Sequence, residues 1–142
     1  MEISDVKKRV FETIERAKRT AGERRTRTDE AAREFDAFLT QIAVPLFRQI
    51  AAVLKAEGRM FTVFTPGGSV RLMSDRSADD YIELSLDTTG LLPQVIGHAS
   101  RGRGRRVTES ETPLGRGGAV RDLTEEDVLG FVMKELEPLV ER

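Results

Sequence analysis

The spacing of apolar and polar positions divides the chain into four parts. Two stretches with helical spacing come first, a stretch of strict alternation follows, and a last stretch again has helical spacing. From Asp29 to Glu57 there is no glycine, and apolar residues recur every three or four positions, which is typical of an amphipathic helix. Its apolar positions are Phe35, Phe38, Leu39, Ile42, Ala43, Leu46, Phe47, Ile50, Val53 and Leu54. Because Pro45 has no backbone N–H, we expect a kink near Gln41 to Pro45. Such a stripe must be buried against the protein's own sheet or against a second copy.

The first stretch, Ile3 to Arg25, predicts a separate helix with a narrower apolar stripe, similar to a coiled-coil seam. The stripe consists of Ile3, Val6, Val10, Ile14, Ala17 and Ala21. The run from Gly22 to Asp29 interrupts it and predicts a hinge or helix boundary, with Thr28 as the N-cap of the next helix. We therefore expect residues 1–27 to form a basic amphipathic helix with a hinge, and residues 28–142 to form a single α+β domain.

From Arg59 onward the period of the pattern changes from helical to alternating, which predicts strands. The five candidate strands are Met60–Thr65, Ser69–Ser74, Asp80–Leu86, Leu92–Ala99 and Arg105–Thr112. The turn signal Pro66-Gly67-Gly68 joins the first two. Short connections favour an antiparallel meander of four to five strands, with one face on the helices. The last strand is mostly polar, so we expect it at an edge.

A third helix follows the strands, because Thr124 to Asp127 approaches a capping box. Its predicted buried stripe is Val128, Leu129, Val132, Met133, Leu136 and Val140. The predicted architecture is thus α+β: two N-terminal helices, the second long and kinked at Pro45, then the meander, then a C-terminal helix.

This order of elements is similar in outline to bacterial secretion chaperones and to kinetochore-type RWD domains, and the resemblance covers no sequence motif. Both groups bind proteins, so the resemblance implies protein binding. The chaperones interleave a helix among their strands, and no such helix is predicted between Arg59 and Thr112.

Composition narrows the chemistry. The 142 residues include no cysteine, which excludes disulfides and thiolate metal sites. The first ten residues lack the apolar core of a secretory signal, and no uninterrupted apolar run approaches the roughly 18 residues of a membrane span. We therefore expect a cytoplasmic protein without membrane contact. Residues 1–28 carry nine basic and five acidic side chains, and residues 120–142 carry three and seven. This polarity favours contact between the two ends, within one chain or between chains.

Four arginines gather at a predicted hairpin tip: Arg101, Arg103, Arg105 and Arg106. Guanidinium groups there are candidates for contact with an anionic partner, because they bind carboxylates and phosphates bidentately. The interpretation that we favour is a solvated tip whose charges discourage edge-to-edge aggregation. Nucleic acid is the weakest of the three interpretations, because the chain's pI is about 6.0 and no aromatic residue is interleaved for stacking on bases.

The single histidine, His98, is the only candidate general base, and it falls on the same strand face as Ile96. No further residue is placed beside it by the sequence. We therefore assign no catalytic, cofactor-binding or metal-ligating residue and expect no cofactor.

These observations favour a non-enzymatic protein-interaction or dimerisation module. We expect a homodimer, in which a helix seam and one face of the sheet bind the partner, and a different protein partner is also considered. Two alternatives stay open. One is a small-molecule carrier or sensor with a pocket between the sheet and the kinked helix. The other is polyanion or nucleic-acid binding through the Arg101–Arg106 hairpin.

Overall fold

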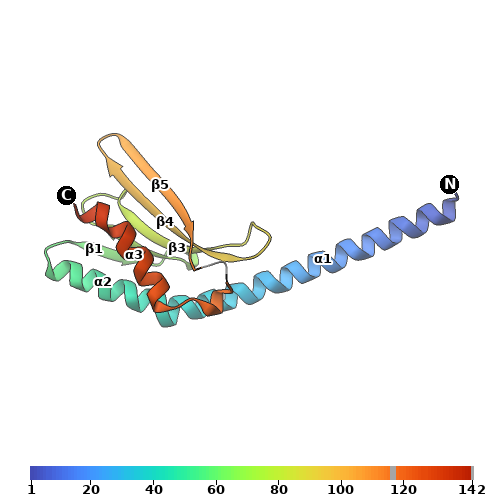
Figure 1. Cartoon of the computed structure of the whole chain (residues 1–142), viewed down its shortest axis with the longest axis horizontal. Helices are drawn as coiled ribbons and strands as arrows, with labels where there is room; N and C mark the ends of the chain where they lie inside the picture. Colours follow the sequence, from blue (N-terminus) through green and yellow to red (C-terminus); the bar gives the residue numbers. More distant parts are fainter. Residues whose placement is uncertain (116–117, 142) are drawn as a thin grey trace.

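The computed structural model describes residues 1–115 and 118–141. It has a long N-terminal helical rod, a five-stranded antiparallel sheet and a C-terminal helix, which confirms the α+β prediction (Figure 1). The rod consists of α1 (Ile3–Phe38), the π-helical turn η1 (Leu39–Ala43) and α2 (Val44–Ala56). The strands are β1 (Phe61–Phe64), β2 (Val70–Ser74), β3 (Tyr81–Asp87), β4 (Gln94–Arg103) and β5 (Arg106–Pro113). Two short 3₁₀ turns, η2 (Pro66–Gly68) and η3 (Val120–Asp122), and the helix α3 (Glu125–Val140) complete it.

The predicted boundary between Gly22 and Asp29 is wrong, because α1 runs through this segment without a break. A single exposed glycine costs a helix only about 1 kcal/mol relative to alanine, and the neighbouring Glu23 and Arg24 are good helix formers. The Thr26 hydroxyl donates to the Gly22 carbonyl at 3.0 Å. Thr28 is therefore a residue inside the helix rather than an N-cap.

The irregularity predicted near Pro45 is confirmed as the π-helical turn η1. The N–H of Val44 donates to the carbonyl of Leu39, five residues back. This wider turn ends two residues before Pro45, which has no N–H to donate, and Figure 1 shows the rod changing direction there. The bend turns α2 across the sheet.

All five predicted strands are present, in the spatial order β1-β2-β3-β4-β5, and each pairs antiparallel with the next. The β4–β5 hairpin turns at Gly104, where φ is 62°. β5 is exposed along its whole length, so the expectation of a polar edge strand is also confirmed.

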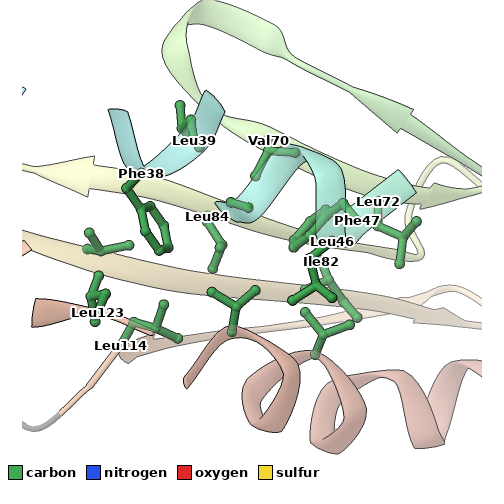
Figure 2. Close-up of a cluster of buried hydrophobic side chains, with 14 of the residues drawn as sticks. Phe38, Leu39, Leu46, Phe47, Val70, Leu72, Ile82, Leu84, Leu114 and Leu123 are labelled. Atoms are coloured by element: carbon green, nitrogen blue, oxygen red, sulfur yellow. The ribbon is translucent and has the colours of Figure 1, made fainter. Parts of the chain in front are cut away.

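One face of the sheet carries the core (Figure 2). Helix α2 contacts β1 and β2, whereas α3 contacts β3 and β4. The fully buried large side chains are Phe47, Val70, Leu72, Ile82, Leu84, Val95, Val128 and Val132. Val53 and Met133, which the helical periodicity assigned to buried stripes, lie on the exposed side of their helices. Gly97 lies under the ring of Phe131, so a side chain at that position would overlap with the ring.

The capping box at the start of α3 is confirmed. The Thr124 hydroxyl accepts from the N–H of Asp127, and the Asp127 carboxylate accepts from the N–H of Thr124 at 2.9 Å. These bonds satisfy N–H groups that a helix start leaves free, and they fix where α3 begins over the sheet.

Within the described residues, the joined helix Ile3–Ala56 contains one 18-residue window with a mean hydropathy of 1.5, enough for a membrane span by length and composition. The mean hydropathy of this window is high although polar residues interrupt its apolar ones. In this structure 39% of that window is buried. A core helix of a folded domain has the same property, and the apolar side of α2 packs on the sheet here.

Candidate interaction surface

The first 27 residues, which we call the α1 arm, extend away from the rest of the molecule as bare helix. Every residue of the arm is exposed, and its N-terminal end is the point farthest from the sheet (Figure 1). The arm is held by helix propensity and local contacts, such as the bond from the Thr13 hydroxyl to the Arg9 carbonyl at 2.8 Å. An isolated helix of this length is only marginally stable in water, because most helical stability in proteins comes from tertiary packing.

The arm carries an apolar stripe, which we define as Ile3, Val6, Val10, Ile14, Ala17 and Ala21. With about 100° between successive residues, all six project within about 60° of Phe35 when viewed along the axis. Phe35 and Phe38 on this same side are buried against the body of the protein. The stripe is thus an unburied continuation of the face that α1 uses to pack.

The four branched residues of the stripe are the clearest anomaly on the molecule. Ile3 is 84% exposed, and Val6, Val10 and Ile14 are about half exposed. Single exposed apolar residues are ordinary, but a continuous row of them is typical of an interaction site.

A cleft of about 470 Å³ lies where the arm joins the body. Helix α1 contributes residues that include Arg27 and Ala31, and the opposite sides come from the β3–β4 loop and from η3 with the two residues before it. The loop brings two strongly exposed apolar residues, Leu91 and Leu92, to this cleft. Ala31 belongs both to the cleft and to the packing face of α1, so the cleft lies further along α1 than the end of the stripe at Ala21.

Two local interactions hold the walls of this cleft. The Thr89 hydroxyl and backbone N–H donate to the same Asp87 carboxylate oxygen at 2.6 and 2.9 Å and fix the start of the β3–β4 loop. These hydrogen bonds, the hydroxyl first, lower the pKa of Asp87 below its ordinary value. Arg121 and Glu34 approach each other at 3.6 Å and join η3 to α1.

The predicted arginine cluster is at the β4–β5 hairpin, as expected, but its members face a neighbour. The strand register places Arg101, Arg103 and Arg106 on the side of the sheet that α3 covers, and Arg105 lies in the turn. Arg103 donates to the carbonyl of Pro138 at 3.3 Å and lies 3.6 Å from Glu141. A cation at the C-terminal end of a helix interacts favourably with its dipole, so Arg103 has an intramolecular role.

His98 lies on the opposite face of the sheet, in a row with polar and aromatic neighbours. Its Nδ1 is 3.8 Å from Glu111, and its ring centre is 5.7 Å from that of Tyr81. Arg71 stacks over the Tyr81 ring at 4.0 Å and pairs with Glu83 at 3.0 Å. Nε2 of His98 is buried, with no hydrogen-bond partner among the described residues. The arrangement is a packed surface row; the described residues bring no nucleophile within hydrogen-bonding distance of the imidazole.

Other binding chemistry has little support in the part of the chain that is described. No group of three or more His, Asp or Glu side chains is arranged to hold a metal ion there. The space between α2 and the sheet, where the carrier hypothesis requires a pocket, is occupied by core side chains that include Phe47 and Leu72.

No protein-family model, curated protein or solved structure matches this chain.

Sequence reasoning found the stripe and the arginine hairpin but missed the cleft. Leu92 was the first residue of the predicted strand Leu92–Ala99, where an apolar residue is expected to be buried, and Leu91 directly preceded it. The strand begins only at Gln94, which leaves both leucines in the loop. The signal that was available is Pro93, because a proline lacks the N–H needed for strand pairing.

Proposed function

We propose that this protein is a non-enzymatic interaction module that self-associates through the α1 arm to form a homodimer. The single observation that carries the proposal is the apolar stripe. It lies on the same side of α1 as the buried Phe35 and Phe38, but it is exposed to solvent. Covering the stripe removes several branched side chains from water, and each is worth about 1.5–3 kcal/mol when fully buried.

The body of the protein supports the same interpretation, because its core does not include residues of the arm. Its core contains residues from Ala31 onward and none from residues 1–27. A segment that contributes nothing to its own core, yet displays a regular apolar row, is suited to a contact between molecules.

The two alternatives receive less support. Arg103 is engaged with the end of α3, which reduces the cluster available to a polyanion. The carrier hypothesis lacks space between α2 and the sheet among the described residues. The expectation of a protein without enzymatic activity stays a prediction.

The test is the molar mass of the full chain in solution, measured by light scattering over a range of concentrations. We expect twice the 15.9 kDa of one chain. The double variant Val10→Glu/Ile14→Glu should be monomeric, because it places two charges on the stripe. Val53→Glu is the matched control, since it changes a valine that is 65% exposed on α2, and it should remain dimeric. A monomeric wild-type chain throughout the range would refute the proposal.

A further inference from the structure

We infer that the two copies pair arm against arm in antiparallel orientation, centred between Glu15 and Arg16, so that the tip of each arm lies beside the cleft of the other copy. The inference rests on the proposed function and specifies its geometry. In this register, the numbers of two residues that lie opposite each other add up to 31.

The first argument is the size of the side chains along the stripe. The N-terminal half of the stripe is branched, with Ile3, Val6, Val10 and Ile14, and the C-terminal half is small, with Ala17 and Ala21. Antiparallel pairing puts Ile14 opposite the partner's Ala17 and Val10 opposite the partner's Ala21. In these two layers large residues meet small ones, and the helices keep an even separation there. Parallel pairing would place alanine on alanine and leave the C-terminal half poorly packed.

The second argument is charge. Residues 1–15 carry three basic and four acidic side chains, and residues 16–28 carry six basic and one acidic. The net charges are −1 and +5. Antiparallel pairing brings the slightly acidic half of each arm to the strongly basic half of the other, whereas parallel pairing brings +5 to +5. Arms about 10 Å apart lie near one Debye length, so this difference is felt at physiological salt.

The third argument is the match between the length of the arm and the position of the cleft. In the sum-31 register, Ile3 lies opposite the partner's Thr28, one turn before the Ala31 that borders the partner's cleft. Met1 and Ile3 are the most exposed apolar residues of the arm, at 91% and 84%. Outside the arm, Leu91 is the most exposed large apolar residue, at 85%. The antiparallel pair brings these exposed residues together.

One layer of this pairing is polar. By the same rule Val6 lies opposite the partner's Arg25, and Lys7 lies opposite the partner's Arg24. The Lys and Arg side chains are long enough to extend their charged ends into solvent while their stems cover the seam. Such a layer lowers affinity but restricts the register, as single polar seam positions do in coiled coils.

The natural absence of cysteine gives a direct test with the full chain. Two single variants, Val10→Cys and Ala21→Cys, are treated with a short bismaleimide, first separately and then as an equimolar mixture that has exchanged subunits. We expect covalent dimers only in the mixture, because residues 10 and 21 of different copies are opposite each other. Both replacements are small, and each variant should keep the wild-type mass by light scattering.

The outcomes separate the inference from the function on which it rests. Covalent dimers in each separate sample mean a parallel pair, which overturns the inference and leaves the homodimer intact. A dimeric mass without any cross-link means that another surface, such as the acidic α3 of the second copy, covers the arm, and this also overturns it. A monomeric mass without cross-links refutes the proposed function itself.

A separate double variant tests the position of the tip of the arm. Leu91→Asp/Leu92→Asp should weaken dimerisation at least tenfold, as measured by the concentration dependence of the mass. Val107→Asp is the control, because Val107 is half exposed on the edge strand β5 and distant from the cleft. A wild-type dissociation constant for the double variant would show that the tip does not contact Leu91 and Leu92.

Discussion

Phe35 and Ile14 lie on the same face of the same helix, separated by three heptads, and their environments are opposite. Phe35 is 3% exposed in the core, whereas Ile14 is 47% exposed on the bare arm. Helix geometry and side-chain type are comparable at the two positions. The difference arises from what lies opposite: η3 and the buried core at one end of α1, and only solvent at the other (Figure 1).

This contrast teaches that an amphipathic pattern identifies a face and leaves its partner unspecified. The apolar residues on this side of α1 form two groups, separated by polar residues such as Arg24 and Thr28. In the tertiary structure one group packs within the molecule, and the other is available to another molecule. The body obtains its stability from the first group, and the proposed function uses the second.

The largest expected effect comes from placing the same charge at both positions. Phe35→Asp should cost more than about 4 kcal/mol and abolish the cooperative unfolding transition, because it buries a carboxylate among core side chains. Ile14→Asp should change the unfolding free energy of the monomer by less than about 0.5 kcal/mol. Thermal and urea unfolding followed by circular dichroism would measure both. Equal losses would mean that residues 1–27 belong to the core.

A smaller loss is expected where the core has no spare space. Gly97→Ala should cost about 1–3 kcal/mol, because the added methyl group overlaps with the Phe131 ring. In the Phe131→Leu background the same change should cost clearly less, and a double-mutant cycle in urea would measure the coupling. Additive losses would show that the two residues do not press on each other. The arm has no comparable position, since an alanine at Gly22 meets nothing within 4 Å.

Removing the arm should be milder still for folding. A chain that begins at Thr28 should fold cooperatively and lose about 1 kcal/mol or less, because the retained helix still includes Ala31 and Phe35 and gains an exposed Thr as an N-cap. It should also lose the dimeric mass. Complete unfolding of the shortened chain would contradict the division into residues 1–27 and 28–142.

The smallest effect tests the arm as a helix. Gly22→Ala should stabilise the arm by about 0.5–1 kcal/mol, since it removes backbone freedom without a steric conflict. Amide hydrogen exchange of residues 10–27 should slow several-fold, with an unchanged urea midpoint for the body. Unchanged exchange would contradict the prediction and show that Gly22 does not weaken the helical conformation of the arm.

Much of the fold was predictable from local pattern. The period change at Arg59, the turn at Pro66-Gly67-Gly68 and the cap at Thr124 each depend on neighbouring residues, and the structure has the expected element at each place. The continuity of α1 through Gly22 was not predictable in this way. A lone glycine and a Thr-Asp pair signal a break in many sequences, but their cost of about 1 kcal/mol is small beside the propensity of the flanking residues.

The candidate interaction surface also has a part that could be predicted from the sequence and a part that could not. The stripe on the arm is a local, helical property and could be read directly from residues 3–21. The cleft could not, because Arg27, Leu91 and Arg121 are far apart in the sequence and meet only when the sheet and η3 dock on α1. The same holds for the arginine hairpin, whose contact with Pro138 and Glu141 depends on where α3 ends.

By itself, then, the sequence determined which segments are helices and strands and which face of each is apolar, since both follow from short-range periodicity and backbone preference. Only the tertiary structure decided which of those faces are covered. Burial depends on the complete set of surfaces that meet when the elements pack, and apolar residues on one side of α1 are core at Phe35 and exposed surface at Ile14.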